Sequence, residues 1–202
     1  MPRTKATQEE RREQILEAAF RVAARDRLDG LTVRRVAREA GLSSGLVFFY
    51  FKTKEALLLA LLDWLLERTI VRRTGTRVLS LPSARERYVE RLREAIEGVV
   101  RERVQVELFF DYWVMGTRHP EVRAKIRHAL DQFREVFRPL AEDLLREEPH
   151  IVAAGTPEGL AAVAVSVVEG CTIQAIMDPE GFDVERFMRS LGSLLAAEPA
   201  TV

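Results

Sequence analysis

The stretch "VRRVAREAGLSSGLVFFYFKTKEAL", from Val33 to Leu57, decides the fold of this chain. Ala37, Gly41 and Val47 lie in it at successive spacings of four and six residues. A small Ala37 lets a second helix cross close by, Gly41 frees the backbone for a tight turn, and Val47 closes the core between the helices. The pattern predicts a helix-turn-helix unit, with a plain helical hairpin as the alternative.

Three hydroxyl residues mark where the helices around this unit begin. We expect Thr32 to cap the first helix of the unit. Ser43 then caps the second helix at 44–50, and Thr53 caps a further helix from Lys54 onward. Each of these side chains has an oxygen that can accept a hydrogen bond from an unpaired backbone N–H of the first helical turn.

The rest of the chain is also predicted to be helical, because apolar residues recur at three- and four-residue spacing and strand signals are almost absent. Thr7 and Glu10 form a capping-box pattern that opens the first helix, which we expect to end at Asp29-Gly30. Later helices are predicted at about 54–72, 84–101, 104–116, 121–147, 157–177 and 183–197. The predicted fold is all-α with about nine helices: an N-terminal helix-turn-helix domain at 1–54 and a C-terminal helical domain at 55–202.

The composition bounds the class of protein. The 202 residues are 47% apolar and 31% charged, an ordinary globular balance. No apolar signal core opens the chain and no apolar run reaches the roughly 18 residues of a membrane span, so we expect a cytoplasmic protein. Cys171 stands alone and the three histidines lie apart, so we expect neither a metal site nor a cofactor. Motifs of nucleophilic catalysis or phosphate binding do not occur, and an enzyme is not expected.

The net charge of zero hides an uneven distribution. Residues 1–54 hold 12 Lys and Arg against 7 Asp and Glu, a net charge of +5, and the remainder holds 19 against 24, a net charge of −5. A basic first quarter on an acidic body indicates that one end meets a polyanion. Chance scatter of solvated charges is the alternative.

A helix-turn-helix presents a defined set of residues to DNA. Its second helix enters the major groove with the N-terminal residues first, while helix ends and basic side chains hold phosphates. Thr32, Arg34 and Arg35 lie near the start of the first helix of the unit. Lys52 and Lys54 lie near the start of the helix that follows it. We therefore expect these five residues to contact the DNA backbone.

The stretch "LTVRRVAREAGLSSGLVFFYFKTKEALLLAL" resembles the DNA-binding region of TetR-family transcriptional regulators, whose usual text is close to "T-v-r-x-I-A-x-x-A-G-v-s-k-g-t-l-Y-x-Y-F-x-s-K-e-x-L". The later stretch "VVEGCTIQAIMDPEGFDVERF" resembles, more loosely, the dimerisation end of several TetR subgroups. The order and length of the predicted helices are similar to the nine-helix layout of that family.

The resemblance implies roles for the aromatic run. Phe48 and Phe51 would be core residues that hold the recognition helix in place, while Phe49 would face the DNA. Tyr50 would offer its hydroxyl, and Lys54 its ammonium group, to phosphates. A stacking platform for single-stranded nucleic acid is the alternative.

The start of the predicted recognition helix departs from the family text. Ser44, Gly45 and Leu46 stand where the family often has Lys or Arg, then Gly, then Thr; with Ser43 they complete the expected DNA-contact set. Such a helix offers few side chains for paired hydrogen bonds with bases. We expect Leu46 and Phe49 to contact thymine methyl groups, and specificity to depend on DNA shape and water.

A dense set of aromatic residues follows the DNA-binding region. Core packing accounts for most of them, but the resemblance implies an effector pocket among the helices of the C-terminal domain. Tyr and Trp suit a pocket because each joins an apolar ring to one polar group, and the lining favours an apolar or amphipathic effector. The candidate ligand-binding residues are Trp64, Phe109, Tyr112, Trp113, Met115, Phe137, Cys171 and Gln174.

The last two predicted helices point to a homodimer. The helix at 157–177 is rich in small residues, and both helices are apolar over more than one face. We predict that these helices from two copies form a four-helix bundle, and that the dimer binds double-stranded DNA at an inverted-repeat operator. The implied function is a repressor that a small effector releases from DNA. An effector-independent or activating regulator, and a helical adaptor for protein contacts, are the alternatives.

Overall fold

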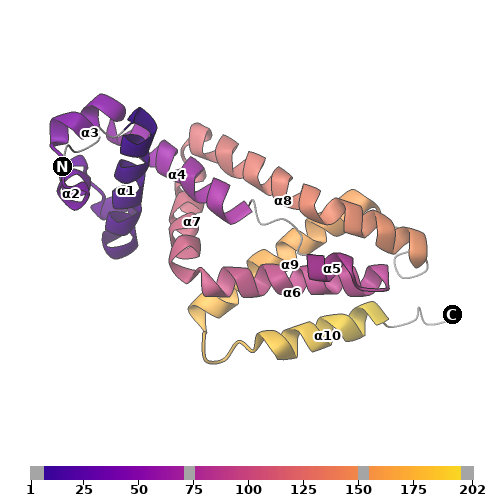
Figure 1. Cartoon of the computed structure of the whole chain (residues 1–202). Coiled ribbons are helices and arrows are strands. Elements are labelled where there is room, and N and C mark those ends of the chain that lie inside the picture. The colour runs from indigo at the N-terminus through magenta and orange to yellow at the C-terminus, as the bar shows by residue number, and fades with distance from the viewer. Residues whose placement is uncertain (1–6, 71–75, 150–154, 197–202) are drawn as a thin grey trace, which may run out of the picture. The chain divides into compact units, whose positions relative to one another are not determined.

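The computed structural model describes residues 7–70, 76–149 and 155–196, and these form helices and short connections without a strand (Figure 1). Their helices are α1 Gln8–Gly30, α2 Val33–Ala40, α3 Ser44–Tyr50, α4 Lys54–Ile70, α5 Thr76–Leu79, α6 Ala84–Arg101, α7 Arg103–Gly116, α8 Pro120–Glu147, α9 Pro157–Met177 and α10 Val184–Ala196. The prediction of an all-α fold is confirmed. The short α5 lies where we expected a break, so the described residues hold ten helices rather than about nine. The predicted end of α4 near residue 72 lies outside the described residues.

The predicted helix ends are confirmed at most positions because they depend on contacts within one turn. The Thr7 hydroxyl accepts from the Glu10 N–H at 3.1 Å, and the Thr7 N–H donates to the Glu10 carboxylate at 2.7 Å. A second capping box, formed by Ser83 and Glu86, opens α6. Gly41 ends α2 with φ 67°, a left-handed conformation that costs a residue with a Cβ more than it costs glycine.

The backbone of α1 is interrupted near its end. Arg27 has φ 60° and ψ 174°, while the helix continues to Gly30. Among the residues that the structure describes, Arg27 is the only non-glycine residue with positive φ. This combination of angles belongs to a region that glycine almost alone occupies, so the Arg27 backbone is strained.

The chain divides into two compact units, each made of separate segments. The first unit comprises Met1–Thr69 and Glu107–Ile126, and the second comprises Ile70–Val106 and Arg127–Val202. The boundaries of these units fall at the end of α4 and inside α7 and α8. The functional division expected from the sequence, with a boundary at residue 54, stays a prediction because compactness alone does not report which residues bind DNA.

The helix-turn-helix core lies in the first unit, where α2 packs against both α1 and α3. Ile15, Val36 and Val47 are fully buried there. Phe51, four residues after Val47, shares its buried face and is only 4% exposed. The prediction that Phe48 is a core residue is wrong: its side chain is 47% exposed. One residue further along a helix lies about 100° around the axis, which turns Phe48 away from the face of Val47.

The core of the second unit is built by α6, α8 and α9, with Met188 of α10. Within it, the Tyr88 hydroxyl donates to the Leu160 carbonyl at 2.8 Å. The Tyr88 ring meets Phe137 edge-on, with 6.3 Å between ring centroids. Burial raises the pKa of the Tyr88 phenol to about 12, so this hydroxyl remains a donor at neutral pH.

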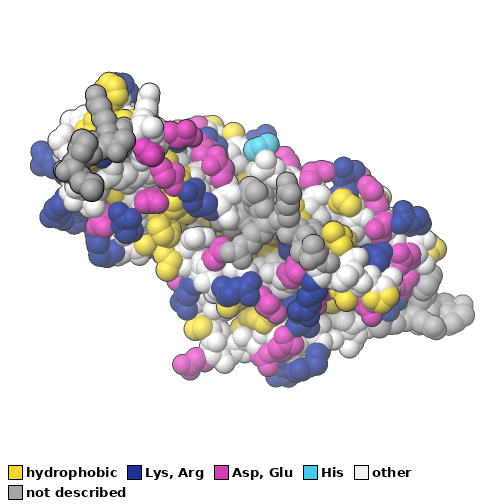
Figure 2. Space-filling view, in the orientation of Figure 1, with side chains coloured by type: hydrophobic (Ala, Val, Ile, Leu, Met, Phe, Trp, Pro, Cys, Tyr) yellow, Lys and Arg dark blue, Asp and Glu magenta, His cyan; other side chains and the backbone are white. Residues whose placement is uncertain are grey.

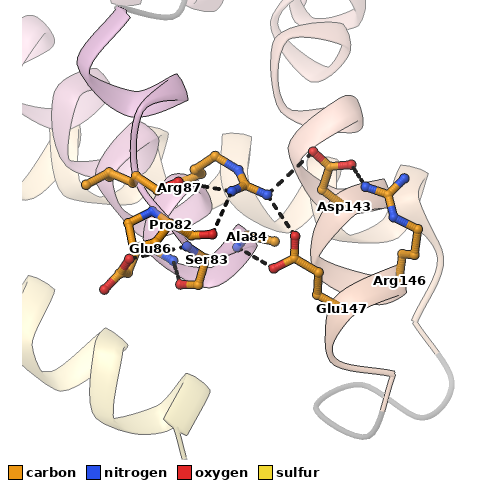
Figure 3. A network of polar contacts seen from close by, with 9 residues as sticks. Pro82, Ser83, Ala84, Glu86, Arg87, Asp143, Arg146 and Glu147 are labelled. Atoms are coloured by element: carbon orange, nitrogen blue, oxygen red, sulfur yellow. Dashed lines mark hydrogen bonds and ion pairs between the residues drawn. The ribbon is translucent and has the colours of Figure 1, made fainter.

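A polar network fastens the start of α6 to the end of α8 (Figure 3). Arg87 Nη2 lies 2.9 Å from Glu147 Oε1 and 3.8 Å from Asp143 Oδ2. Arg87 Nη1 donates to the Leu81 carbonyl at 3.0 Å, and Glu147 accepts the Ala84 N–H at 2.7 Å. Glu147 therefore satisfies one of the unpaired N–H groups at the start of α6, although it lies 63 residues further along the chain. We refer to these contacts as the Arg87 network.

By length and composition, α9 is apolar enough to cross a membrane, although the sequence analysis expected no such segment. Core helices of soluble proteins meet the same criterion. Leu160, Ala164 and Val168 of α9 belong to the core of the second unit and pack with α6 and α8. This packing accounts for the buried face of α9, while Val163, Ile173 and Met177 on the same helix are exposed.

Candidate nucleic-acid interface and ligand-binding residues

The exposed face of α3 includes a glycine and an apolar aromatic side chain. Ser43 caps it by accepting the Leu46 N–H at 3.1 Å. A Cβ added at Gly45 would meet no atom within 4 Å, and the Phe49 ring is 62% exposed. The packing of the protein therefore does not require glycine at position 45, and it leaves Phe49 uncovered. An exposed aromatic ring and a missing side chain suit the close approach of another molecule to α3.

A basic side chain is held against the aromatic residues of α3. The Lys52 ammonium lies 5.2 Å from the centre of the Phe49 ring, within the range of a cation–π contact. Phe49 in turn meets Tyr50 edge-on, with 5.4 Å between centroids. Basic side chains gather on the exposed surface of the first unit, at the left of Figure 2. Both apolar and cationic contacts are thus available beside α3.

The start of α2 carries the predicted phosphate-binding residues. The Thr32 hydroxyl caps the helix by accepting the Arg35 N–H at 3.3 Å, and Arg34 is exposed. Arg35 Nη1 donates to Asp26 Oδ2 at 3.0 Å and to the Gly30 carbonyl at 3.1 Å. The Arg35 guanidinium is therefore anchored to the end of α1, a contact that the sequence analysis did not foresee.

The start of α4 follows the same pattern. Thr53 accepts the Ala56 N–H at 3.0 Å, as the sequence predicted. Lys52 is exposed, and Lys54, Tyr50 and Ser44 are partly exposed. Exposure makes these side chains accessible, and their contacts with DNA stay a prediction.

Trp64, a predicted ligand-binding residue, holds α1 and α4 together. Its indole N–H donates to Glu13 Oε1 at 2.8 Å, and the ring is 8% exposed. Arg68 covers the ring at 3.8 Å from its centre and pairs with the same Glu13 carboxylate. The polar group that made Trp64 attractive as a ligand contact is thus used within the protein.

Helix α7 carries four of the other predicted ligand-binding residues, and all of them lie in the first unit. Tyr112 is fully buried, and its hydroxyl donates to the Leu58 carbonyl at 2.8 Å. Burial, with Asp111 beside it, raises the pKa of the Tyr112 phenol. Trp113 stacks on Phe110 with 6.1 Å between centroids and an angle of 16° between the rings. The partly buried members of the predicted set on this helix are Phe109, Trp113 and Met115.

The remaining predicted ligand-binding residues lie in the second unit. Phe137 and Cys171 are buried in its core, and burial raises the pKa of the Cys171 thiol to about 11. Gln174 is exposed, with its side-chain amide 3.4 Å from the Gly170 carbonyl. Neither unit by itself brings the whole predicted set together.

A different hollow, of about 140 Å³, opens in the second unit between the end of α6, the end of α9 and the start of α10. Val99, Arg103, Ile176 and Phe182 are among its lining residues, none of which was predicted to bind a ligand. Among the described residues, no group of three or more His, Cys, Asp or Glu side chains is placed to hold a metal ion.

The fold and the exposed α3 agree with two family models. Residues 15–61 match the model described as "Bacterial regulatory proteins, tetR family". Residues 84–199, more than half of the chain, match the model described as "BetI-type transcriptional repressor, C-terminal". The chain belongs to the TetR family of DNA-binding transcriptional regulators. Within that family, its C-terminal region is similar to the BetI type.

Full-length relatives agree with this assignment. An uncharacterized HTH-type transcriptional regulator from the dhlA 5' region of Xanthobacter autotrophicus is 28% identical over 189 residues, which cover 90% of this chain and 88% of the relative. The regulator BetI of Stenotrophomonas maltophilia is 28% identical over 194 residues, covering 94% and 92% of the two chains. A transcriptional regulator of Saccharomonospora viridis, solved in complex with choline, has the same fold, with a TM-score of 0.75, 21% identity, and coverage of 94% and 97%.

Proposed function

We propose that the protein is a dimeric repressor that binds an inverted-repeat operator and is released from it by a small effector. The observation that carries this proposal is the capped, exposed α3, with Gly45 open and the Lys52–Phe49 pair at its end. In this proposal Leu46, which is partly exposed, and Phe49, which is exposed, meet thymine methyl groups in the major groove. Arg34, Lys52 and Lys54 supply phosphate contacts, which are sequence-independent.

The exposed face of α9 supports the dimer. Val163, Ile173 and Met177 are 55%, 41% and 76% exposed, and Gly170 lies between them on the same helical face. A Cβ at Gly170, or at Gly192 of α10, would meet no atom within 4 Å. A second copy packing on this face would cover the apolar side chains and explain the two glycines, because small residues let helices approach closely. Static light scattering at micromolar concentration tests the dimer; a monomeric mass would exclude it.

The effector is proposed to be apolar or amphipathic. The partly buried Trp113 and the stacked Phe110 offer ring faces, and such faces bind both hydrocarbon groups and quaternary ammonium groups. The Saccharomonospora viridis structure contains choline, a small amphipathic cation, which makes choline a reasonable first probe. Effector and operator must weaken each other's binding by the same factor, because the coupling free energy is reciprocal.

Selection from random duplex DNA with the full-length protein tests the DNA-binding function. An enriched inverted repeat, bound with an affinity that falls steeply with salt, is the expected result. The absence of an enriched sequence would contradict an operator-binding repressor. Binding without dependence on salt would favour the helical adaptor instead. Release of the enriched operator by choline, or by a fatty acid as a second probe, would show the effector response; no release by any amphipathic compound would favour an effector-independent regulator.

A further inference from the structure

The strained Arg27 has a side chain that is tied to α7 at three points. Nη1 donates to Glu107 Oε2 at 3.0 Å, and Nη2 donates to Asp111 Oδ1 at 2.7 Å and to the Glu107 carbonyl at 3.1 Å. All three residues lie in the first unit. The surrounding structure thus holds a backbone conformation that an arginine would not adopt alone.

The same short segment also holds the start of α2. Arg27 lies between Asp26 and Gly30, which together fix the Arg35 guanidinium at 3.0 and 3.1 Å. The turn is tightly packed, since a Cβ at Gly30 would come within 2.7 Å of Asp26 Cβ. Because Asp26 and Gly30 flank Arg27 along the chain, a change in the Arg27 backbone would shift the groups that anchor Arg35.

We propose that Arg27 is a positioning residue for operator binding, which links the position of α7 to the start of α2. The contacts form a continuous path from Asp111 through Arg27 and the 26–30 turn to Arg35. Thr32 and Arg34, two of the residues expected from the sequence to contact the DNA backbone, lie beside its far end. Strain favours a two-state element, because the Arg27 backbone relaxes once α7 releases the side chain.

The position of Glu107 and Asp111 on α7 would let an effector act on this path of contacts. Glu107 and Asp111 lie four residues apart on α7. The stacked rings of Phe110 and Trp113 lie on the same helix, one residue before and two residues after Asp111. An effector that rotates or shifts α7 through its aromatic side chains would also move the two carboxylates. This use rests on the proposed function, since it requires both an operator and an effector.

The anchor at Asp111 is sensitive to the loss of Arg27. Asp111 Oδ2 is buried and has no hydrogen-bond partner among the described residues, while Oδ1 accepts from Arg27. A buried carboxylate that loses its cation is unstable in place, so the two residues should behave as one unit in mutagenesis.

The test measures binding of the full-length protein to the operator that wild type enriches from random duplexes. We expect Arg27→Ala and Asp111→Asn each to raise the Kd by about tenfold, within the range typical of allosteric coupling, and the double variant to add little. The slope of log Kd against log salt should stay unchanged, because neither residue contacts a phosphate. Arg101→Ala removes an exposed arginine whose ion pair stays within α6, and it should change the Kd less than twofold.

Three results would overturn the inference. Asp111→Asn without effect on the Kd would break the path at α7. A salt slope lowered by about one in Arg27→Ala would make Arg27 a direct phosphate contact instead. A wild-type protein that enriches no operator would overturn the proposed function, and this inference with it.

Hydrogen exchange gives a second measurement that needs no DNA. In Asp111→Asn, the amides of residues 28–36 should exchange several-fold faster than in wild type, although the substitution lies on α7. Arg27→Gly, whose backbone fits the observed angles, should show the same faster exchange if Arg27→Ala does not fold. Unchanged exchange in both variants would overturn the inference.

Discussion

Arg87 and Arg27 each bridge two carboxylates, and they do so under opposite backbone conditions. Arg87 lies in the regular first turns of α6, with a side chain 15% exposed, and reaches Glu147 and Asp143. Arg27 lies on a strained backbone, with a side chain 44% exposed, and reaches Glu107 and Asp111. The same chemistry thus stabilises a fixed junction in the second unit and holds a relaxable segment in the first. Whether an ion-pair network fixes a junction or holds a segment that can relax therefore depends on the conformation of the backbone that carries it.

The largest expected effect is on the fixed junction. Arg87→Ala removes four contacts and leaves Glu147 with only the Ala84 N–H. We expect a loss of about 2–3 kcal/mol in the free energy of unfolding, since the guanidinium is largely buried. Urea unfolding followed by circular dichroism measures it. Arg146→Ala is the matched control: its side chain is 71% exposed and pairs within α8, so a loss below about 0.5 kcal/mol is expected. Equal losses in both variants would contradict the fixed-junction role.

The Arg87 network should also make stability depend on pH. The Ala84 N–H, and then Arg87, hold the pKa of Glu147 below its ordinary value of 4.5. A carboxyl group whose pKa is lower in the folded state stabilises the protein above pH 4.5, and this stabilisation is lost as pH falls through the folded pKa. The difference in melting temperature between wild type and Glu147→Gln should therefore be constant near neutral pH and shrink below pH 4.5. Glu10, Glu39 and Glu55 also have lowered pKa values, but they contribute equally to both proteins and cancel.

A smaller effect on stability is expected from two buried tyrosines, one in each unit. Tyr88 and Tyr112 each donate to a backbone carbonyl at 2.8 Å, to Leu160 and Leu58 respectively. Substitution by Phe removes this hydrogen bond between helices, and we expect each variant to lose about 1 kcal/mol of stability. Tyr112→Phe loosens α7 from α4 in the first unit and should also weaken operator binding. Tyr88→Phe should leave the operator Kd unchanged; an equal effect of both on the Kd would remove the distinction between the units.

The features that the sequence predicted correctly depend on contacts between residues that are close together in the chain. The capping box of Thr7 and Glu10 and the left-handed Gly41 each need only residues within one turn, so their types and spacing suffice. The bond from Arg27 to Asp111 joins residues 84 apart, and the bond from Trp64 to Glu13 joins residues 51 apart. No local pattern encodes such pairs, because the tertiary fold decides which helices meet.

The same limit applies at the candidate sites. Aromatic residue types predicted ring burial but not the partner of each polar group, such as the bond from the Trp64 N–H to Glu13. The exposure of Phe48 followed from helical geometry, since only positions near Val47 and Phe51 face the small core. The exposed character of α3 was predictable from its position in the helix-turn-helix. The strain at Arg27 was not, because the residue type argues against it.

The smallest net change in stability is expected for Arg27→Gly, at the strained position. Arg27→Ala loses the bonds to α7 and keeps a Cβ on the unfavourable backbone, so we expect a loss of about 1–2 kcal/mol, discounted because the side chain is 44% exposed. Arg27→Gly loses the same bonds but relieves strain worth about 1–3 kcal/mol, and its net change should lie within about 1 kcal/mol of wild type. Urea unfolding of the two variants isolates the strain as their difference, because the lost contacts are common to both. If Arg27→Gly were as unstable as Arg27→Ala, the backbone would hold no strain. Arg27 would then be a fixed junction of the same kind as Arg87, and the contrast between the two units would disappear.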